Sequence, residues 1–460
     1  MKVSPERYRA YTRRNIHELP QYSALPPEHQ EAIQVVSTVF PFRTNSYVVN
    51  ELIDWSDIPN DPIFRLTFPV REMLPAEDYA RVRDLLADGA DQQTLTGAVN
   101  AIRMQHNPHP AGQMQYNVPR LDGQPVPGLQ HKYHETVLFF PAQGQTCHAF
   151  CTYCFRWAQF VGIDELKFAA SDIDPAIAYL RQHPEVTDIL FTGGDPGIMK
   201  TRVWDRYINA LLDARLEGLQ SIRVGTKALA YWPGRFVTDR DADELLRVLE
   251  GAVARGMHIA VMAHFSHPAE LRTDIVREAI RRLRSAGCEI RMQAPLIRGV
   301  NDDPGVWAEL WREGVRLGMI PYYMFVERDT GPRGVFEVPL ARAQRIFREA
   351  FSQVSGLGRT VRGPVMSATP GKVHVHSVQE IGESRYFMLS FLQARDPAWV
   401  GRPFLAEFDR TATWLRDLTP AFGEDRFFFE GDYTRFVRGD ETSGVPEAEE
   451  KAVNERLSLN

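Results

Sequence analysis

Six short apolar runs in the middle of the chain constrain its fold more than any other feature. Each run is rich in β-branched or aromatic residues and is bounded by turn signals, which is typical of buried parallel strands. The runs are Val137–Phe140, Ile189–Thr192, Ile222–Gly225, Ile259–Ala263, Ile290–Ala294 and Tyr322–Val326. From the second run onward their starts lie about 30–37 residues apart, which accommodates one strand and one crossover helix. The pattern predicts an α/β protein with an incomplete (β/α)6 barrel or a strongly curved sheet, in which chemistry belongs at the carboxyl ends of the strands.

The segments on either side of these runs predict an extension at each end of the barrel. Residues 1–125 combine many turns with helical patterns, so we expect a mostly helical N-terminal extension. The barrel is expected over residues 126–345, and a C-terminal segment over residues 346–460 ends in a polar, acid-rich tail from Ser443. Helical patterns cover Asp78–Ala87, Gln93–Arg103, Asp239–Arg255, Pro268–Gly287 and Leu340–Phe351, and Thr360–His376 resembles a strand.

The composition is that of an ordinary soluble globular protein, with 44% hydrophobic and 24% charged residues. A net charge of -6 gives no sign of nucleic-acid or membrane-surface binding. We find no apolar run long enough to cross a membrane and no secretory signal at the start. Three of the four cysteines are clustered, which argues against a disulfide framework and suits a reducing cytosol. We therefore expect a cytoplasmic protein that binds neither nucleic acid nor membranes.

The clustered cysteines are Cys147, Cys151 and Cys154, spaced as C-x3-C-x2-C. Three thiolates can ligate three irons of a 4Fe–4S cluster, which leaves the fourth iron without a protein ligand. An open iron can bind and reduce a small molecule, whereas a fully ligated electron carrier cannot. The alternative is three unrelated core cysteines. Cys288 lies outside the motif, and we expect it to be a small core residue.

The cysteine motif, with Tyr153 before its last cysteine, resembles the signature of the radical S-adenosylmethionine (SAM) superfamily. Gly193-Gly194-Asp195 follows the second predicted strand and resembles the superfamily element that binds the amino group of SAM. Longer stretches resemble one branch, the lysine 2,3-aminomutase family. They are Val39–Asn45 with Pro59–Ile63, Val126–Tyr133, the cysteine motif with Arg156, Ile222–Lys227 with His264–Pro268, and Gln293–Asp302. The resemblance implies a partial (β/α)6 radical SAM barrel.

The same resemblance implies roles for the matching residues around the cluster. The three cysteines would hold the 4Fe–4S cluster, and Gly193, Gly194 and Asp195 would hold SAM. His264 and Gln293 would lie nearby, although a histidine at such a place can also be a satisfied core residue. Arg156 matches the position that pairs with the substrate carboxylate, a task for which a planar guanidinium is suited; the alternative is a surface arginine.

The family also uses pyridoxal 5′-phosphate (PLP), bound by a lysine after a glycine-rich turn. Lys372 occupies that place here, but its turn is shorter and has one glycine. A lysine in a low-dielectric site can lose its proton and form a Schiff base. Family members place arginines before the first strand to hold PLP, and the matching places here are Lys132, next to Tyr133, and Thr136. We assign Lys132 and Tyr133 to cofactor binding; an ordinary exposed Lys372 is the alternative.

The stretches that select lysine in the family differ in this chain. Lysine-specific members use two aspartates to bind the distal ammonium group, and here the stretches are Glu327-Arg328-Asp329 and Met366-Ser367-Ala368. If Arg328 faces the pocket, lysine would be repelled and an acidic or polar side chain preferred; if Glu327 or Asp329 does, a cation remains acceptable. No cysteine follows Cys288, so the structural zinc of some members has no ligands here. His267, His374 and His376 are interpreted as structural.

The resemblance implies a radical SAM isomerase: a PLP-dependent amino-acid 2,3-aminomutase that moves an amino group from Cα to Cβ through a 5′-deoxyadenosyl radical. The implied partners are a small amino-acid substrate and a flavodoxin- or ferredoxin-type electron donor, in a chain that could form a homo-oligomer. The first alternative is a radical SAM enzyme that works without PLP, such as an epimerase, a dehydrogenase or an eliminating enzyme. The second is a non-catalytic iron–sulfur redox protein. The sequence does not identify the substrate amino acid.

Overall fold

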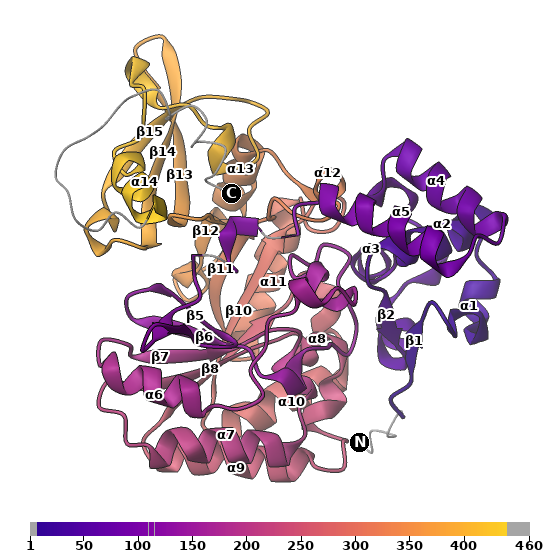
Figure 1. Ribbon diagram of the computed structural model, residues 1–460, viewed down its shortest axis with the longest axis horizontal. Helices are drawn as coiled ribbons and strands as arrows, with labels where there is room; N and C mark the ends of the chain where they lie inside the picture. Colours follow the sequence, from indigo (N-terminus) through magenta and orange to yellow (C-terminus); the bar gives the residue numbers. More distant parts are fainter. Residues whose placement is uncertain (1–6, 109, 115, 439–460) are drawn as a thin grey trace.

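A curved sheet of 11 strands forms the centre of the protein, which is described by a computed structural model over residues 7–108, 110–114 and 116–438 (Figure 1). The strand order is β15-β14-β13-β12-β11-β10-β9-β8-β7-β6-β5, and seven neighbouring strands within it run parallel. The parallel strands are β6 (Thr136–Phe139), β7 (Asp188–Phe191), β8 (Ser221–Thr226), β9 (His258–His264), β10 (Glu289–Leu296), β11 (Ile320–Val326) and β12 (Arg362–Ser367). All six predicted strands are among them, which confirms the α/β class with a largely parallel sheet.

Helices connect the parallel strands and cover one face of the sheet (Figure 1). They are α6 (Asp174–Gln182), α7 (Thr201–Asp213), α8 (Ala228–Tyr231), α9 (Ala242–Ala254), α10 (Asp274–Ser285), α11 (Pro304–Arg316), α12 (Arg333–Phe336) and α13 (Leu340–Ser352). Each strand-to-strand step across this part of the sheet is parallel, as crossover connections through helices require. The carboxyl ends of β6 to β11 therefore meet at one rim.

Helix α10 shows how the local sequence sets the bounds of these elements. The helix was expected from Pro268, but residues Pro268–Leu271 form a separate 3-10 turn. The Thr273 side chain then accepts a hydrogen bond from the Val276 amide and starts the regular helix. Gly287, with φ +82°, ends it, because this left-handed conformation suits glycine. The helical prediction is therefore correct in type and begins too early.

The N-terminal part is mostly helical and packs against the barrel (Figure 1). Its helices are α1 (Pro20–Ser23), α2 (Pro27–Val39), α3 (Pro62–Thr67), α4 (Ala76–Ala87) and α5 (Gln92–Gln105), and its strands are β1 (Ala10–Thr12), β2 (Arg43–Asn45), β3 (Arg120–Leu121) and β4 (Gln124–Pro125). Buried side chains of α2, such as Ile33 and Val36, belong to one continuous hydrophobic cluster with barrel residues such as Val137. The boundaries at residues 125 and 345 remain a prediction.

The C-terminal part adds an antiparallel layer to the same sheet. It comprises β13 (Gly371–Ile381), β14 (Ser384–Ala394), β15 (Pro403–Glu407) and α14 (Glu430–Arg438). The stretch predicted as one strand, Thr360–His376, is instead β12 and β13, which pair antiparallel across a tight turn. A second hydrophobic cluster, with Phe387 and Trp414 among its members, lies in this layer. The polar tail from Ser443 falls outside the described residues.

The curvature of the sheet brings its two ends together at what we call the seam, the approach of β5 (Leu129–Tyr133) to β13 and β14. Strand β5 pairs antiparallel with β6, at the opposite end of the sheet order from β14, yet it approaches β14 in space. The Lys132 ammonium donates a hydrogen bond across the seam to the carbonyl of Ala368, in the turn between β12 and β13. The barrel is thus nearly closed by side chains rather than by a strand ladder.

Candidate active site

The three clustered cysteines lie in the loop that follows β6, at the carboxyl rim of the barrel. Burial raises the pKa of all three thiols, that of Cys154 to about 12, and neighbouring thiols add to the rise at Cys147 and Cys154. No group of three or more His, Cys, Asp or Glu side chains among the described residues converges on a single metal ion. The donor set of three thiols suits a 4Fe–4S cluster, whose cysteine ligands bind separate irons.

The cysteine loop is held to the N-terminal part by hydrogen bonds between side chains and backbone carbonyls. The Asn45 amide donates hydrogen bonds to the carbonyls of His148 and Tyr231, at 3.1 and 3.0 Å. The Thr152 hydroxyl donates to the Arg65 carbonyl at 2.6 Å. These partners lie far away in sequence, so the loop is positioned by tertiary structure and not by its own residues.

The glycine pair lies against the cysteine loop, where no side chain fits. A Cβ atom on Gly193, whose φ is +132°, would lie 2.1 Å from the Gln145 side chain, and one on Gly194 would lie 2.5 Å from the Thr146 amide nitrogen. The Asp195 carboxylate accepts hydrogen bonds from the Thr226 hydroxyl at 2.5 Å and from the Lys227 amide at 2.8 Å. Burial raises the pKa of this carboxyl group. Asp195, in the loop after β7, thus ties the glycine turn to the end of β8.

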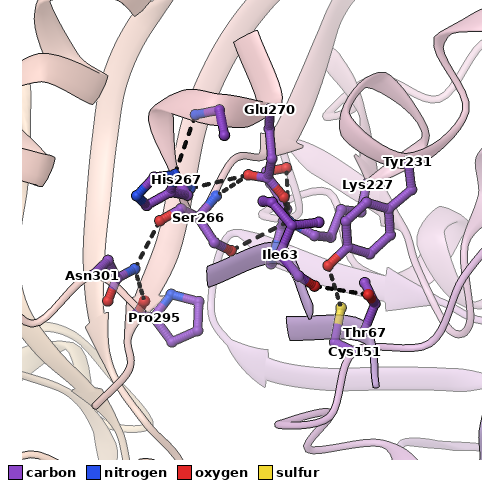
Figure 2. A network of polar contacts seen from close by, with 12 residues as sticks. Ile63, Thr67, Cys151, Lys227, Tyr231, Ser266, His267, Glu270, Pro295 and Asn301 are labelled. Atoms are coloured by element: carbon purple, nitrogen blue, oxygen red, sulfur yellow. Dashed lines mark hydrogen bonds and ion pairs between the residues drawn. The ribbon is translucent and has the colours of Figure 1, made fainter. Parts of the chain in front are cut away.

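A buried polar network lies beside the cysteine loop and reaches it through Tyr231 (Figure 2). The Lys227 ammonium lies 2.7 Å from a Glu270 carboxylate oxygen and 3.2 Å from the Ser266 hydroxyl. Tyr231 packs its ring under the same ammonium, at 4.5 Å from the centroid, and places its hydroxyl 3.8 Å from the Cys151 sulfur. The charge of Lys227 therefore lies beside a candidate cluster ligand, although sequence analysis did not single it out.

His264, the last residue of β9, is paired with Gln293 in the middle of β10. The Nε2 atoms of the two side chains are 3.0 Å apart. Burial lowers the pKa of His264 to about 3, and Lys227 and Arg156 contribute further to this lowering. The imidazole is therefore neutral, with one ring nitrogen as a donor and the other as an acceptor, and Gln293 contacts Nε2.

Arg156 follows the last cysteine and lies buried, with 7% of its surface exposed, so it is not a surface arginine. Its guanidinium carbon lies 4.4 Å from the Phe140 ring centroid and 4.9 Å from that of Phe155. Burial, together with the nearby charge of Arg328, lowers the pKa of Arg156 to about 9. Its Nη1 atom is buried without a hydrogen-bond partner among the described residues.

The three residues of the stretch around Arg328 have different surroundings, with Glu327 and Asp329 buried and Arg328 partly buried. Arg328 lies over the Phe155 ring, 4.7 Å from its centroid. The Asp329 carboxylate instead contacts the Arg416 guanidinium at 3.1 Å. Glu327 is buried, and burial raises the pKa of its carboxyl group well above the ordinary range. Arg328 is therefore the charged group of the stretch that lies beside Arg156.

Lys132, Tyr133 and Lys372 come together at the seam. The two ammonium groups lie 5.3 and 5.2 Å from the centroid of the Tyr133 ring, and Lys372 also lies 5.0 Å from that of Tyr323. The Lys372 ammonium donates to the Gln393 side chain at 2.6 Å. Burial lowers the pKa of Lys372 to about 7 and that of Lys132 well below its usual range, and neighbouring cations lower both further.

Several residues of this cluster were not found from the sequence. Arg223 reaches from β8 to the Asp188 carboxylate and to the Thr136 hydroxyl, so a guanidinium lies beside the position where the family has an arginine on β6. A charged residue inside an otherwise apolar strand is the signal that could have identified it. Gln393 and Arg395 come from β14 and its end, which the sequence pattern did not predict.

The remaining candidates have local partners. His267 accepts a hydrogen bond from the Ala269 amide and caps a 3-10 turn. His374 and His376 contact the Gly363 carbonyl and the Ser390 hydroxyl. Cys288 is buried in the core, where desolvation raises its pKa to about 12. Each is held by the fold, in agreement with a structural role.

None of the helices in the described part of the chain is long and apolar enough to cross a membrane.

Comparisons with known proteins point to one group. An Aquifex aeolicus protein provisionally named L-lysine 2,3-aminomutase is 28% identical over 417 residues, which cover 90% of this chain and 98% of that protein. The L-lysine 2,3-aminomutase of Bacillus subtilis is 26% identical over 333 residues, 66% of each chain. That of Clostridium subterminale is 27% identical over 311 residues, 67% of this chain and 62% of that one.

Two further comparisons add less. No family model matches the chain. Among solved structures, Streptococcus suis SuiB bound to the precursor peptide SuiA aligns with a TM-score of 0.34 and 12% identity, over 60% of this chain and 58% of that one. That likeness is too remote to carry an argument.

Proposed function

Because this chain is homologous to the lysine 2,3-aminomutase family of radical SAM enzymes, we propose that it is an amino-acid 2,3-aminomutase that uses a 4Fe–4S cluster, SAM and PLP. The observation that carries the proposal is a line of interacting side chains. The charge of Arg156 interacts with Cys154 at one end and with Arg328 at the other. Arg328 interacts with Tyr133, whose ring lies beneath Lys372. A chain of neighbouring side chains thus links the candidate cluster ligands to the candidate PLP lysine.

The cofactors would supply the difficult chemistry. The cluster and SAM would supply a 5′-deoxyadenosyl radical that removes a hydrogen atom from Cβ, and PLP would supply the means of moving the α-nitrogen. Cys147, Cys151 and Cys154 would hold the cluster. The backbone of the Gly193-Gly194 turn and the neutral His264 would border SAM. A one-electron donor of the flavodoxin or ferredoxin type would reduce the cluster.

Arg156 would bind and orient the substrate carboxylate. A buried guanidinium with an unpartnered Nη1 is poised to form charge-assisted hydrogen bonds with an anion. Phe140 and Phe155 cover its faces, so its donors point in the plane of the group. The surrounding apolar side chains would exclude water from the radical, which protects it from side reactions.

Lys372 would form the covalent link to PLP. With a pKa of about 7, about half of the molecules carry a neutral amine at neutral pH, and only that form attacks an aldehyde. The cationic groups at the seam, Lys132 first among them, would attract the phosphate. Borohydride trapping of PLP followed by peptide mass analysis should place the label on Lys372.

The decisive experiment is turnover without oxygen by reconstituted protein, with dithionite, SAM and a panel of amino acids. We expect 5′-deoxyadenosine and an isomer of one amino acid with its nitrogen on Cβ. Cys151→Ala should lose the cluster and both products, whereas Cys288→Ala, which changes a buried cysteine outside the motif, should keep them. An intact cluster that never cleaves SAM would refute the proposal.

A PLP-independent radical SAM enzyme is a second candidate, because Thr136 lies where the family has an arginine. The Thr136 hydroxyl donates a hydrogen bond to the Asp188 carboxylate. Under this alternative SAM is cleaved, but borohydride traps no PLP and the nitrogen stays on Cα.

A further inference from the structure

We propose that Arg328 selects a substrate whose side chain ends in a carboxylate, so that the enzyme acts on a dicarboxylic amino acid. This inference rests on the proposed aminomutase function and names the substrate class of the same site. The feature behind it is a pair of guanidinium groups, those of Arg156 and Arg328, that share one phenylalanine ring.

Both groups lie over the Phe155 ring. Their carbons lie 4.9 and 4.7 Å from its centroid. Throughout the described part of the chain, neither side chain forms an ion pair or a side-chain hydrogen bond, and the Nη1 atom of Arg156 is fully buried. A buried guanidinium without an anion is costly, and a second positive charge nearby adds to that cost unless a ligand neutralises it.

The nearby carboxylates do not fill that role. Glu327 and Asp329 are close enough to act on the charge of Arg328, but Asp329 is paired with Arg416 at 3.1 Å. Glu327 is buried and forms no ion pair within the described residues. A ligand that brings two carboxylates would satisfy both guanidinium groups, one through its α-carboxylate at Arg156 and one through its side chain at Arg328.

The same arrangement disfavours a lysine substrate, whose distal ammonium would lie beside the guanidinium of Arg328. Chemistry then sets the length of the acidic side chain. Moving the amino group of aspartate from Cα to Cβ returns aspartate, because its two carboxyl groups exchange roles. Glutamate is the shortest acidic amino acid that gives a different compound, its 3-amino isomer. In that isomerisation one C–N bond breaks and one forms, and a hydrogen atom moves from Cβ to Cα, so no oxidant or reductant is consumed.

Calorimetric binding to the reconstituted, unreduced holoenzyme with SAM tests the inference without turnover. Glutamate should bind about 10- to 100-fold more tightly than glutamine, which has the same shape and no charge, because a charge-assisted hydrogen bond contributes about 1.5–3 kcal/mol. Arg328→Gln should abolish that preference. Arg402→Gln is the matched control, since Arg402 is exposed and lies over Phe428 in the C-terminal layer, at 4.1 Å from its centroid.

Turnover separates this inference from the function on which it rests. If lysine is isomerised and glutamate is neither bound nor converted, Arg328 does not select a carboxylate, although the aminomutase function stands. If no amino acid is isomerised but glutamate is preferred and Arg328→Gln removes the preference, the carboxylate site is supported and the function is wrong. Equal binding of glutamate and glutamine by the wild type overturns the inference.

Discussion

Lys372 and Lys132 share one tyrosine ring at the seam, so the folded chain must keep two amines close together away from water. Burial is the main cause of their lowered pKa values. Nearby arginines lower both pKa values further, and Lys372 also lowers that of Lys132. A charge that is costly to bury is retained where its chemistry is needed, which is a frequent property of catalytic sites. The cost should be measurable as a pH-dependent loss of stability.

We expect wild-type stability to rise relative to Lys372→Met as the pH increases from about 7 toward 10. Burial lowers the pKa of Lys372 from 10.5 to about 7. Below pH 7 both states hold the proton, so the penalty is constant; between the two pKa values only the unfolded state holds it, and the penalty fades by at most about 1.4 kcal/mol per pH unit. Urea unfolding across this range measures the difference, and a difference that does not change with pH would contradict the assignment.

The Lys227–Glu270 pair gives a second test at this scale. Only 10% and 0% of the two side chains are exposed, so Lys227→Met leaves a buried carboxylate without its partner. The expected cost is about 3–5 kcal/mol in the free energy of unfolding. Arg281→Met breaks an exposed pair with Glu278 and should cost less than about 0.5 kcal/mol. Similar unfolding midpoints for the two variants would show that the buried pair is not a stabilising contact.

At the scale of elements, the cysteine loop depends on β2 and on the short helix α8, which lie far from it in sequence. Asn45, at the end of β2, donates to the loop carbonyl of His148 and to the Tyr231 carbonyl at the end of α8. One side chain therefore joins three segments. The loop keeps its shape because these elements are in place, and loading of the cluster should depend on them.

Asn45→Ala should lower the iron and sulfide content after reconstitution. The Tyr231 carbonyl loses its side-chain donor, at a cost of about 1–3 kcal/mol, whereas the His148 carbonyl keeps the hydrogen bond from the Tyr8 hydroxyl. Asn209→Ala removes a surface hydrogen bond to Asp205 and serves as the control. Iron and sulfide analysis per chain, with thermal unfolding beside it, checks the expectation; full loading of Asn45→Ala would mean that the cysteines position themselves.

The parallel strands were predictable because each contains a short run rich in β-branched or aromatic residues bounded by turn signals, even where buried and partly buried residues alternate, as in β8. The antiparallel layer was not, because strands such as β14 mix buried and exposed residues irregularly. The stretch Thr360–His376 was predicted as a single strand because the turn before Gly371 is too short to interrupt the apolar pattern.

The same distinction applies to the candidate site. The cysteine motif and the glycine pair are local patterns, so spacing alone identifies them. The groups around Lys372 converge from β5, β8 and β14, and only the closing of the sheet brings Arg223 and Gln393 to the same place. Sequence offered Glu327, Arg328 and Asp329 as alternatives for this stretch, and the Asp329–Arg416 pair accounts for one of them.

On the scale of the whole molecule, the two hydrophobic clusters meet along one sheet, and the seam joins its distant ends. Because the proposed PLP site lies across the seam, its occupation should stabilise both sides together. We expect added PLP to slow amide exchange in β5 and β13 in parallel, with little change in α7. Protection confined to one side, or absent from both in protein that traps PLP, would place the cofactor elsewhere. Hydrogen-exchange mass spectrometry provides the measurement.

The distance along the chain between the cysteine loop and Lys372 has a consequence for biogenesis. During synthesis, the iron-binding loop and the elements that surround it leave the ribosome long before β13 exists. Under the proposed function, the cluster can therefore be inserted before PLP is captured. A truncated chain that ends before β13 would lack the proposed PLP lysine, so completion of the last strands would set the order of assembly.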